Sequence, residues 1–446
     1  MARRETGSGP RDCGTDRTAL PPSPTSRARV PRLKVLIVST LYAPNEIGGA
    51  EATARMIAEG LVTRGHEAVA VSIAPDGEEC ERAINGVHCY YVELANIYWP
   101  HAPGFRPALW QKIVWHLFDS YNPVMQRKLG AILDREKPDV VHAHNLQGFS
   151  VSAWRAARRR NIPVVQTLHD YYLACPNSVM VRPGKSPCKT PCVECRVFGL
   201  PRRLLSNLPD TVTAVSKRTL TLLEGRGLFS RVRSKRIIHG GNPETAALPE
   251  RTDRSGGHPL RFGFLGRLEP VKGLEVVMDA MQMLAPDAAT LLIGGKGAPD
   301  YMAKLKEGSQ TANITFAGFI RPEEFFPQID VLIVPSLWEE PCPRVVHEAF
   351  GYRVPVFASR IGGIPEMVKP GMTGELFAPG DAQALARLMQ EAAGSGRLVL
   401  RYGAHLEKAR KNHEAGRILG AYESALADAA AQRNRNSGRG LSCKEV

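Results

Sequence analysis

The sequence predicts an α/β protein built from doubly wound, mostly parallel sheets. Short apolar runs rich in β-branched residues alternate with helical segments along most of the 446 residues, and this alternation is typical of βαβ units. It occurs twice, on either side of a segment rich in Gly, Pro and charged residues at 240–258. Glycine-rich or polar loops follow several of the runs, which is where open α/β sheets bind their ligands. We therefore expect two such domains.

The first predicted domain covers residues 33–240 and opens with a strand, a glycine loop and a helix. The strand is Lys34 to Ser39, the loop contains Gly48 and Gly49, and the helix spans 50–60. Glycines at a helix N-terminus let backbone N–H groups approach a phosphate or a sugar, although a plain tight turn would use the same residues. Further strands are expected at 68–73, 88–92, 140–144, 163–167 and 211–216.

A long apolar segment at 105–134 interrupts this alternation. It carries a stripe of large side chains together with Arg106 and Lys112, a combination that could lie on a bilayer surface. Such a stripe more often packs into a protein core, and we expect a core helix here. The stripe comprises Trp110, Ile113, Val114, Trp115, Leu117 and Phe118.

The second predicted domain covers residues 259–412 and follows a linker at 241–258. Its strands are expected at 261–265, 290–293, 314–317, 331–334 and 355–358, with helices at 274–284, 301–307 and 322–328. A C-terminal helix at 413–431 is expected to return to the first domain, and residues 432–446 are predicted to form a disordered tail.

Composition excludes some classes of protein and favours an anionic partner. No run approaches the ~18 apolar residues of a membrane-spanning helix, and residues 1–32 are predicted to be a disordered leader because they lack the apolar core of a secretory signal. We therefore expect a cytoplasmic protein. The net charge is +14, half of it in the two termini. Positive charge favours phosphorylated ligands, nucleic acids or acidic membranes, but no base-stacking or zinc-finger pattern indicates a nucleic-acid partner.

The strand, loop and helix at 331–351 contain the most informative residues. Glu340 lies in the loop and Glu348 in the following helix, and eight residues would span ~12 Å along a continuous helix. That is too far for two carboxylates acting on one bond, but it suits two acceptors that hold hydroxyls at the two ends of an elongated polar ligand. Two ordinary surface charges are the alternative.

Three loops of the second domain have the features of a phosphate or sugar site. Arg267 and Lys272 lie between the first strand and its helix, where a guanidinium and an ammonium group suit a diphosphate. Glycine loops follow two further strands, at 294–297 and 362–366. Each loop alone is a weak signal, but the three loops and the two glutamates together favour a ligand site.

His169 follows the predicted strand at 163–167 directly, with Asp170 beside it. A lone histidine is more often structural, but a His-Asp pair at the carboxyl end of a strand is the arrangement expected of site residues.

Four cysteines form a C-x12-C-x3-C-x2-C pattern in a long loop at 175–195. Their grouping is typical of a tetrahedral thiolate site, and the simplest interpretation is a structural zinc with no catalytic role. Two disulfides and four unconnected thiols remain alternatives. The four residues are Cys175, Cys188, Cys192 and Cys195.

Together these motifs resemble a retaining glycosyltransferase of family 4 with the GT-B fold, in which two Rossmann-like domains face each other across a cleft. The resemblance covers about residues 34–430. The E-x7-E of Glu340 and Glu348, flanked by PSLWE and EAFG, is its most specific part, and it is supported by GGAE at 48–51, GRLEPVKG at 266–273 and GGIPE at 362–366.

The resemblance implies roles for the residues that match its motifs. Glu348 would hold the ribose hydroxyls of a nucleotide-sugar donor, and Glu340 would contact the donor sugar. Arg267 and Lys272 would neutralise the diphosphate, including the charge that develops as it leaves, so that no cofactor or metal is needed for catalysis. His169 would reach the donor sugar from the first domain.

Other matching residues would line the same site. Gly48 and Gly49 would lie near the phosphates or the acceptor, and Phe319 and Ile320 would lie against the base. The GGIPE loop, with Gly363 and Glu366, would support the donor. The family often has a glycine-rich loop after the first glutamate, where this chain has Pro341-Cys342-Pro343. Prolines donate no hydrogen bond, so this departure leaves the identity of the donor sugar open.

The function implied is transfer of a sugar, with retention, to a glycan, a lipid-linked or a small-molecule acceptor in polysaccharide or cell-envelope biosynthesis. A lipid-linked acceptor would bring peripheral contact with the inner face of the membrane. A sugar-nucleotide epimerase of the same fold is one alternative, and a non-catalytic protein that only binds the nucleotide sugar is another.

Overall fold

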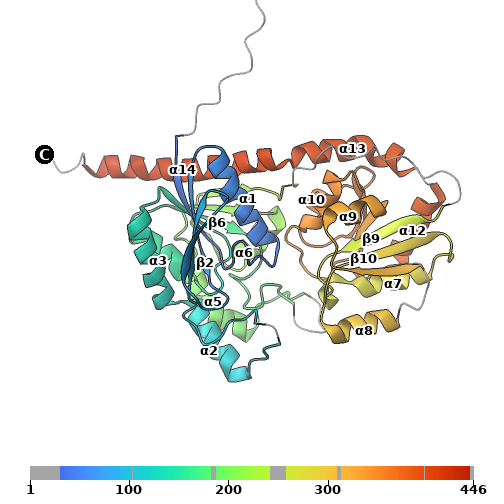
Figure 1. Ribbon diagram of the computed structural model, residues 1–446, viewed down its shortest axis with the longest axis horizontal. Helices are drawn as coiled ribbons and strands as arrows, with labels where there is room; N and C mark the ends of the chain where they lie inside the picture. The colour runs from blue at the N-terminus through green and yellow to red at the C-terminus, as the bar shows by residue number, and fades with distance from the viewer. Residues whose placement is uncertain are drawn as a thin grey trace, which may run out of the picture. The chain divides into compact units, whose positions relative to one another are not determined.

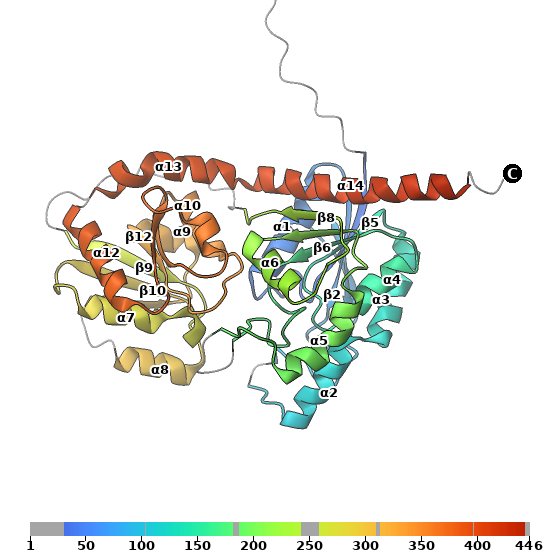
Figure 2. The same ribbon diagram turned by 180° about the vertical axis from the view of Figure 1, so that it is seen from behind.

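The computed structural model describes residues 31–441 apart from 103, 182–186, 242–257, 309–312 and 396. The predicted leader at 1–32 and the predicted linker at 241–258 lie almost wholly outside the described residues, as does the end of the predicted tail, 442–446. The described chain contains two α/β domains, seen from opposite sides in Figures 1 and 2.

The first domain is built on an eight-stranded sheet of order β3-β4-β2-β1-β5-β6-β7-β8. All neighbouring strands are parallel except the edge pair β3 and β4. The strands are β1 (Lys34–Val38), β2 (Glu67–Ile73), β3 (Cys80–Ile84), β4 (Val87–Val92), β5 (Val140–Ala143), β6 (Val164–Leu168), β7 (Thr211–Ala214) and β8 (Ser234–Ile237).

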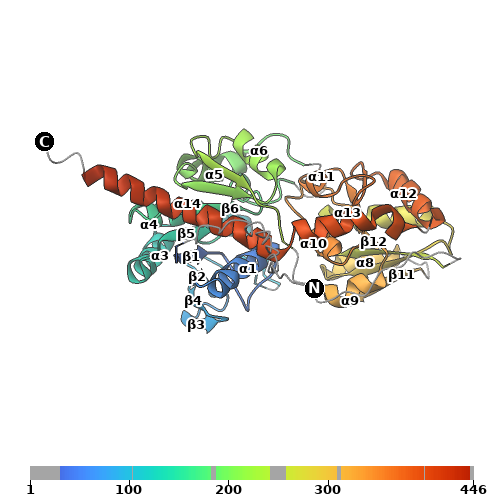
Figure 3. The same cartoon turned by 90° about the horizontal axis from the view of Figure 1, so that it is seen from above.

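Helices cover both faces of this sheet. They are α1 (Gly49–Thr63), α2 (Leu109–Ser120), α3 (Pro123–Glu136), α4 (Ser152–Arg158), α5 (Val193–Leu205) and α6 (Lys217–Gly225), together with α14 (Ala415–Leu441) from the end of the chain. Figure 3 shows α14 running across the first domain beside α1, and its side chains also contact β5 and β6.

The side chains of β1 point alternately to the two faces of the sheet, and both faces are apolar. Val35 and Ile37 pack with α1 and α14 in one hydrophobic cluster. Leu36 and Val38 pack with α3 and α4 in another. Because successive side chains of a strand point to opposite faces, a strand covered on both sides must be apolar throughout, which is why these strands read as continuous apolar runs.

The second domain is built on a six-stranded parallel sheet of order β11-β10-β9-β12-β13-β14. The strands are β9 (Leu260–Leu265), β10 (Ala289–Gly294), β11 (Ile314–Gly318), β12 (Val331–Val334), β13 (Val356–Ser359) and β14 (Gly374–Phe377). Its helices are η1 (Pro270–Lys272), α7 (Leu274–Gln282), α8 (Pro299–Glu307), α9 (Pro322–Phe325), η2 (Phe326–Gln328), α10 (Arg344–Gly351), α11 (Ile364–Met367), α12 (Ala382–Ser395) and α13 (Leu398–Asn412). All of them except η1 share one hydrophobic core with the sheet.

The predicted core helix at 105–134 is corrected by the structure. Trp115 is buried, but Trp110 is 64% exposed, and Ile113, Leu117 and Phe118 are exposed as well. The segment forms two helices, α2 and α3, and α2 packs against α5 with only part of its apolar surface. None of the helices in the described part of the chain is long and apolar enough to cross a membrane.

Candidate active site

The carboxyl ends of β9 and β12, two neighbouring strands, bring Lys272 and Glu340 together. The Lys272 Nζ atom lies 2.9 and 3.1 Å from the two carboxylate oxygens of Glu340. Ser336 donates a hydrogen bond to the same carboxylate at 3.0 Å. The side chain of Glu340 is only 6% exposed and that of Lys272 only 19%, so this is a largely desolvated ion pair at the position where ligands of such sheets bind.

Gly273 allows the two loops to approach so closely. It has a φ of +71°, and a Cβ atom at this position would lie 2.2 Å from the carbonyl oxygen of Pro335. Both the left-handed conformation and the close backbone contact therefore require glycine. The position of Lys272, one residue earlier, depends on this contact.

Trp338 joins the loop after β12 to the first domain. Its side chain is 7% exposed and packs in the first domain's hydrophobic cluster, where it meets the Tyr171 ring edge-on with 6.5 Å between centroids. The Lys272 Nζ atom lies over the Trp338 ring, 5.5 Å from its centre. The same tryptophan thus contacts the candidate diphosphate-binding lysine and the loop that follows β6.

Arg267 lies at the end of β9 with most of its side chain in solvent. It pairs with Glu269 at 3.0 Å and its side chain is 62% exposed. The loop beneath it packs tightly, because a Cβ atom on Gly295 would lie 1.8 Å from the carbonyl oxygen of Gly266. The backbone at Arg267 is therefore held by a tightly packed loop, while its guanidinium group is accessible to solvent.

Glu348 lies in α10, and its side chain is 12% exposed and 3.3 Å from Arg344. Burial raises the pKa of its carboxyl group, and Arg344 acts in the opposite direction. Arg344 also faces the glycine loop of the first domain, since a Cβ atom on Gly49 would lie 2.8 Å from its Cδ. Gly48 is close to the buried Glu51, whose Oε2 would lie 3.0 Å from its Cβ.

The GGIPE loop supports the backbone of Glu340. Gly363 donates its N–H to the Glu340 carbonyl at 2.7 Å, and Gly362, with a φ of +62°, would place a Cβ atom 2.2 Å from the same oxygen. The carboxylate of Glu366 has a different partner, because it accepts hydrogen bonds from the backbone N–H groups of Lys217 and Arg218 at 2.7 Å each. In this structure Glu366 therefore caps helix α6 of the first domain.

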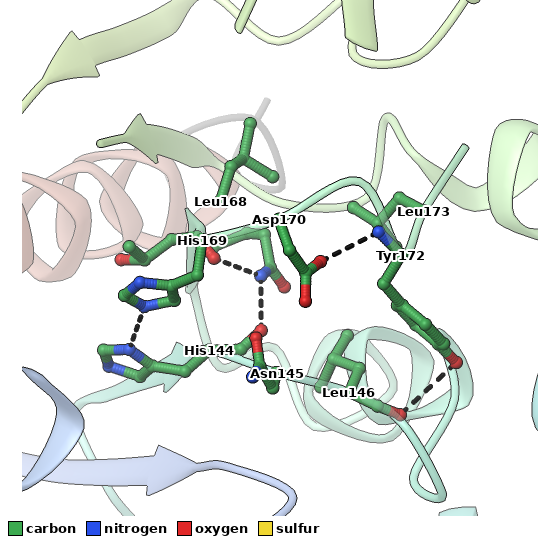
Figure 4. Close-up of a pocket in the computed structure, with 10 residues that line it drawn as sticks. His144, Asn145, Leu146, Leu168, His169, Asp170, Tyr172 and Leu173 are labelled. Carbon is green, nitrogen blue, oxygen red and sulfur yellow. Dashed lines mark hydrogen bonds between the residues drawn. The ribbon is translucent and has the colours of Figure 1, made fainter. Parts of the chain in front are cut away.

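Three histidines lie side by side at the carboxyl ends of β5 and β6. His144 Nδ1 and His169 Nε2 are 2.8 Å apart, with the rings stacked, and His142 Nε2 lies 2.7 Å from Thr167 Oγ1. Figure 4 shows His144 and His169 facing each other in a pocket that Asp170 also lines. Burial lowers the pKa of His169 to about 4, so its imidazole is neutral at pH 7.

Asp170 occupies the other side of this pocket. Its carboxylate accepts the backbone N–H of Tyr172 at 2.8 Å, and burial raises its pKa to about 6. A neutral imidazole and a carboxyl group with a raised pKa can both bind sugar hydroxyls without bringing two full charges into a buried site.

Phe319 and Ile320 follow β11 and have different environments. The Phe319 side chain is 71% exposed, with Lys296 Nζ 5.4 Å from its ring centre. Ile320 packs on the domain core, where a Cβ atom on Gly294 would lie 2.6 Å from its Cγ2. An exposed ring beside a half-buried aliphatic side chain leaves an aromatic face available for stacking.

The structure does not support the predicted zinc site. Cys192 and Cys195 face each other across the first turn of α5, with their sulfur atoms 3.4 Å apart, and a hydrogen bond with Cys195 lowers the pKa of Cys175. The thiols of Cys175, Cys188, Cys192 and Cys195 are all free. Within the part of the chain that the structure describes, no group of three or more His, Cys, Asp or Glu side chains has an arrangement that could hold a metal.

Sequence reasoning missed three residues of this region. His144 follows β5 directly, as His169 follows β6, and the position of a histidine at the end of a predicted strand was a usable signal. Ser336 and Arg344 carry no such signal, because their contacts with Glu340 and Glu348 depend on how the loop after β12 folds.

Two α/β domains with loops gathered at the carboxyl ends of their parallel strands are the architecture of the GT-B fold. Residues 259–394 match the family described as glycosyl transferases group 1, and residues 48–238 match the glycosyl transferase 4-like domain. The chain belongs to this glycosyltransferase family.

Relatives and solved structures agree with this assignment. An uncharacterised 42.6 kDa protein from a cps region of Klebsiella pneumoniae is 30% identical over 335 residues, which are 75% of this chain and 87% of the relative. An uncharacterised glycosyltransferase of Methanocaldococcus jannaschii is 25% identical over 79% of this chain and 87% of its own. The crystal structure of Anabaena HepE in complex with UDP matches with a TM-score of 0.66 and 19% identity, over 89% of this chain and all of that one. The predicted GT-B fold is thereby confirmed.

Proposed function

We propose that this glycosyltransferase moves a sugar from a nucleoside diphosphate sugar to a hydroxyl group of a glycan, lipid-linked or small-molecule acceptor, with retention of anomeric configuration. The observation that carries the proposal is the Lys272–Glu340 pair at the ends of β9 and β12, with the exposed side chain of Arg267 at the same end of the sheet. A cation pair for a diphosphate and an acid for the sugar are the minimum that such a donor requires.

The diphosphate would be held by Lys272 and Arg267. Each unit-charge contact at ~4 Å near a protein surface has a gross energy of about 4 kcal/mol before desolvation. The charge on the diphosphate grows as the bond to the sugar breaks, so the same two groups stabilise the transition state more than the bound donor. Moving Lys272 partly away from Glu340 would leave that carboxylate free to accept hydrogen bonds from the sugar.

The remaining contacts fit the two ends of the donor. Glu348 is a largely buried carboxylate held by Arg344, and it suits the diol of a ribose. The exposed ring of Phe319 suits the base. His169, neutral because of its burial, suits a hydroxyl of the donor sugar.

Retention is what the resemblance to family 4 implies, and we propose that it is reached without a covalent glycosyl-enzyme. We find no Asp or Glu pair among the described site residues that would act as nucleophile and acid at glycosidase spacing. The bond between the anomeric carbon and the phosphate oxygen would break while the acceptor oxygen attacks from the same face. The leaving phosphate oxygen would take the acceptor's proton, and the nucleoside diphosphate would leave with it.

The comparisons suggest which substrates to test first. Solved structures of Anabaena HepE contain UDP, glucose or UDP-glucose, so UDP-glucose is the first donor to test. The Klebsiella relative comes from a cps region, which fits an acceptor in polysaccharide biosynthesis.

The test is a panel of UDP, GDP and ADP and their sugars, read by thermal shift and then by turnover. A true donor at 100 times its Kd should stabilise the protein by about 2.7 kcal/mol. The active donor is then incubated with acceptor, and the product's anomeric configuration is read by NMR. Retention with release of the nucleoside diphosphate supports the proposal. Inversion refutes the mechanism, and conversion of the nucleotide sugar without any acceptor would identify an epimerase instead.

A further inference from the structure

Helices α2 and α5 pack together and present an apolar surface to solvent. The side chains that form it are 43–75% exposed, and we call this surface the α2–α5 apolar face. It consists of Leu109, Trp110, Ile113, Leu117 and Phe118 of α2 and Val193, Val197, Leu200 and Leu204 of α5.

The apolar side chains of α5 are spaced so that they lie on one face of the helix. Positions 193, 197, 200 and 204 recur every three or four residues and so form one stripe, and helices of globular proteins normally turn such a stripe to the core. Here the stripe points outward, while Phe198 and Arg202 lie on the buried side. A concentrated exposed apolar surface of this kind marks an interaction site.

The buried side of the two helices contains an ion pair, which holds the helices in the orientation that turns the apolar stripe outward. Arg202 and Asp119 are both 0% exposed and form an ion pair at 2.9 Å. The guanidinium also lies 3.9 Å from the centre of the Tyr172 ring, and Ser120 donates to the Phe198 carbonyl at 2.9 Å. Rotating either helix to bury its apolar stripe would break this ion pair and leave buried charges without partners.

The charged residues around the α2–α5 apolar face indicate which kind of partner it would bind. Arg106, Lys112, Arg196 and Arg203 are exposed on or beside the two helices, and Glu194 is the one exposed acid of α5. Apolar side chains with an indole ring and a basic margin suit the boundary between the headgroups and acyl chains of an anionic bilayer. We propose that the α2–α5 apolar face docks this protein on the surface of an anionic phospholipid membrane.

The same ion pair connects the docking face to the loop that carries His169. Arg202 donates to the Tyr172 carbonyl, Tyr172 donates its hydroxyl hydrogen to the Asp119 carbonyl at 3.0 Å, and Asp119 accepts the Gly148 N–H at 2.6 Å. Tyr172 is two residues after Asp170. If the α2–α5 apolar face docks on a bilayer, it would hold this loop near the bilayer surface. That position would favour a lipid-linked acceptor, and this inference about the acceptor rests on the proposed function.

The test measures binding of the full chain to vesicles in the absence of any donor. Sedimentation with phosphatidylcholine vesicles is compared with sedimentation with phosphatidylcholine–phosphatidylglycerol vesicles. The variants are Leu117→Gln/Leu204→Gln in the face and Arg196→Gln/Arg203→Gln at its margin, with Met283→Gln, an exposed apolar residue of the second domain, as the control. The melting temperature of each variant verifies that it is folded.

We expect wild type and the control to bind the anionic vesicles alone. The leucine variant should bind roughly tenfold or more weakly, because two large apolar side chains no longer enter the bilayer, and the arginine variant should lose the preference for anionic lipid. Equal binding of wild type and leucine variant, equal binding to both kinds of vesicle, or no binding would overturn the proposal. A leucine-dependent dimer in light scattering without vesicle binding would assign the face to a second copy. Donor binding, measured separately, keeps this result independent of the proposed function.

Discussion

Lys272 Nζ lies within 3.1 Å of both carboxylate oxygens of Glu340, and this contact joins the loops that follow the two central strands of the second domain. The pair is mostly desolvated. Because a buried charge without a partner is costly, each of the two groups stabilises the other's charge. In the proposed function, the diphosphate of the donor would bind Lys272 and the sugar of the donor would bind Glu340. If the proposed function holds, the pair keeps both groups in place before the donor binds.

Removing one member of this pair should destabilise the fold as well as abolish activity. We expect Lys272→Met to lower the free energy of unfolding by about 3–5 kcal/mol, because it leaves Glu340 buried and unpaired. Lys272→Met/Glu340→Gln should recover most of that stability yet remain inactive, because neither the ammonium nor the carboxylate is present. Urea denaturation and a donor-turnover assay measure the two effects. Full activity in the double variant would show that the pair is only structural.

Gly273→Ala should be far more harmful than a comparable change at Gly371. Both glycines have a φ just above +70°, but only at Gly273 would a Cβ atom meet a backbone oxygen, at 2.2 Å, whereas Gly371 has no atom within 4 Å. The left-handed conformation alone costs alanine about 1–2 kcal/mol. We expect Gly371→Ala to lose about that much, and Gly273→Ala to lose clearly more and to bind donor poorly. Equal losses in thermal denaturation would mean that the loop contact with Pro335 is dispensable.

Acid should destabilise the protein between about pH 6.5 and 4. Burial lowers the pKa of His142 to about 3 and of His169 and His413 to about 4, so the unfolded chain binds more protons in this window and the stability present above pH 6.5 is lost as the pH falls. Asp170 opposes this, because its raised pKa of about 6 gives stability that is lost as the pH rises.

Burial also raises the pKa of Glu46, Asp119 and Glu348. Among the described residues, more histidines have a lowered pKa than carboxyl groups have a raised one, so the net effect is a loss. We expect about 1–2 kcal/mol for each buried histidine between pH 7 and pH 5. Urea midpoints at the two pH values should differ less in His142→Gln than in wild type, while the exposed His405→Gln should behave as wild type does. A pH dependence that His142→Gln leaves unchanged would contradict this assignment.

Glu366→Ala should affect stability more than donor binding. The carboxylate accepts two N–H groups at the start of α6, and losing a cap of this kind costs about 0.5–2 kcal/mol. Donor affinity should fall less than about tenfold, through loosening of the Gly363–Glu340 contact. Denaturation and donor titration separate the two effects. A large loss of donor affinity in a stable variant would instead favour direct contact with the donor, as the family resemblance implies.

Much of the fold could be predicted from the sequence because both sheets are covered on both faces. Val331–Val334 is apolar at every position, and such a run indicates a buried parallel strand. The antiparallel edge strand Cys80–Ile84 could not be recognised, because it is largely exposed and has no apolar pattern. The outward orientation of α2 was missed for a related reason: periodicity locates an apolar face but does not say what covers it.

The candidate site was less predictable than the fold. The spacing of Glu340 and Glu348 and the loop from Arg267 to Lys272 pointed to one end of the second sheet, because topology alone places successive strand ends together. The pairing of Lys272 with Glu340, the His144–His169 contact and the capping of α6 by Glu366 depend on side-chain packing between distant segments. No local pattern in the sequence encodes them.

The most direct measurement of the central claim is a calorimetric titration of the active nucleotide sugar into four proteins: wild type, Arg267→Ala, Glu348→Gln and the exposed Lys408→Ala as a charge-matched control. Removal of a charge-assisted contact to the diphosphate should raise the Kd at least about tenfold in Arg267→Ala. Glu348→Gln should weaken the nucleotide as well as the sugar donor, and Lys408→Ala should leave the Kd unchanged. Identical Kd values in all four proteins would contradict the claim that these side chains bind the donor.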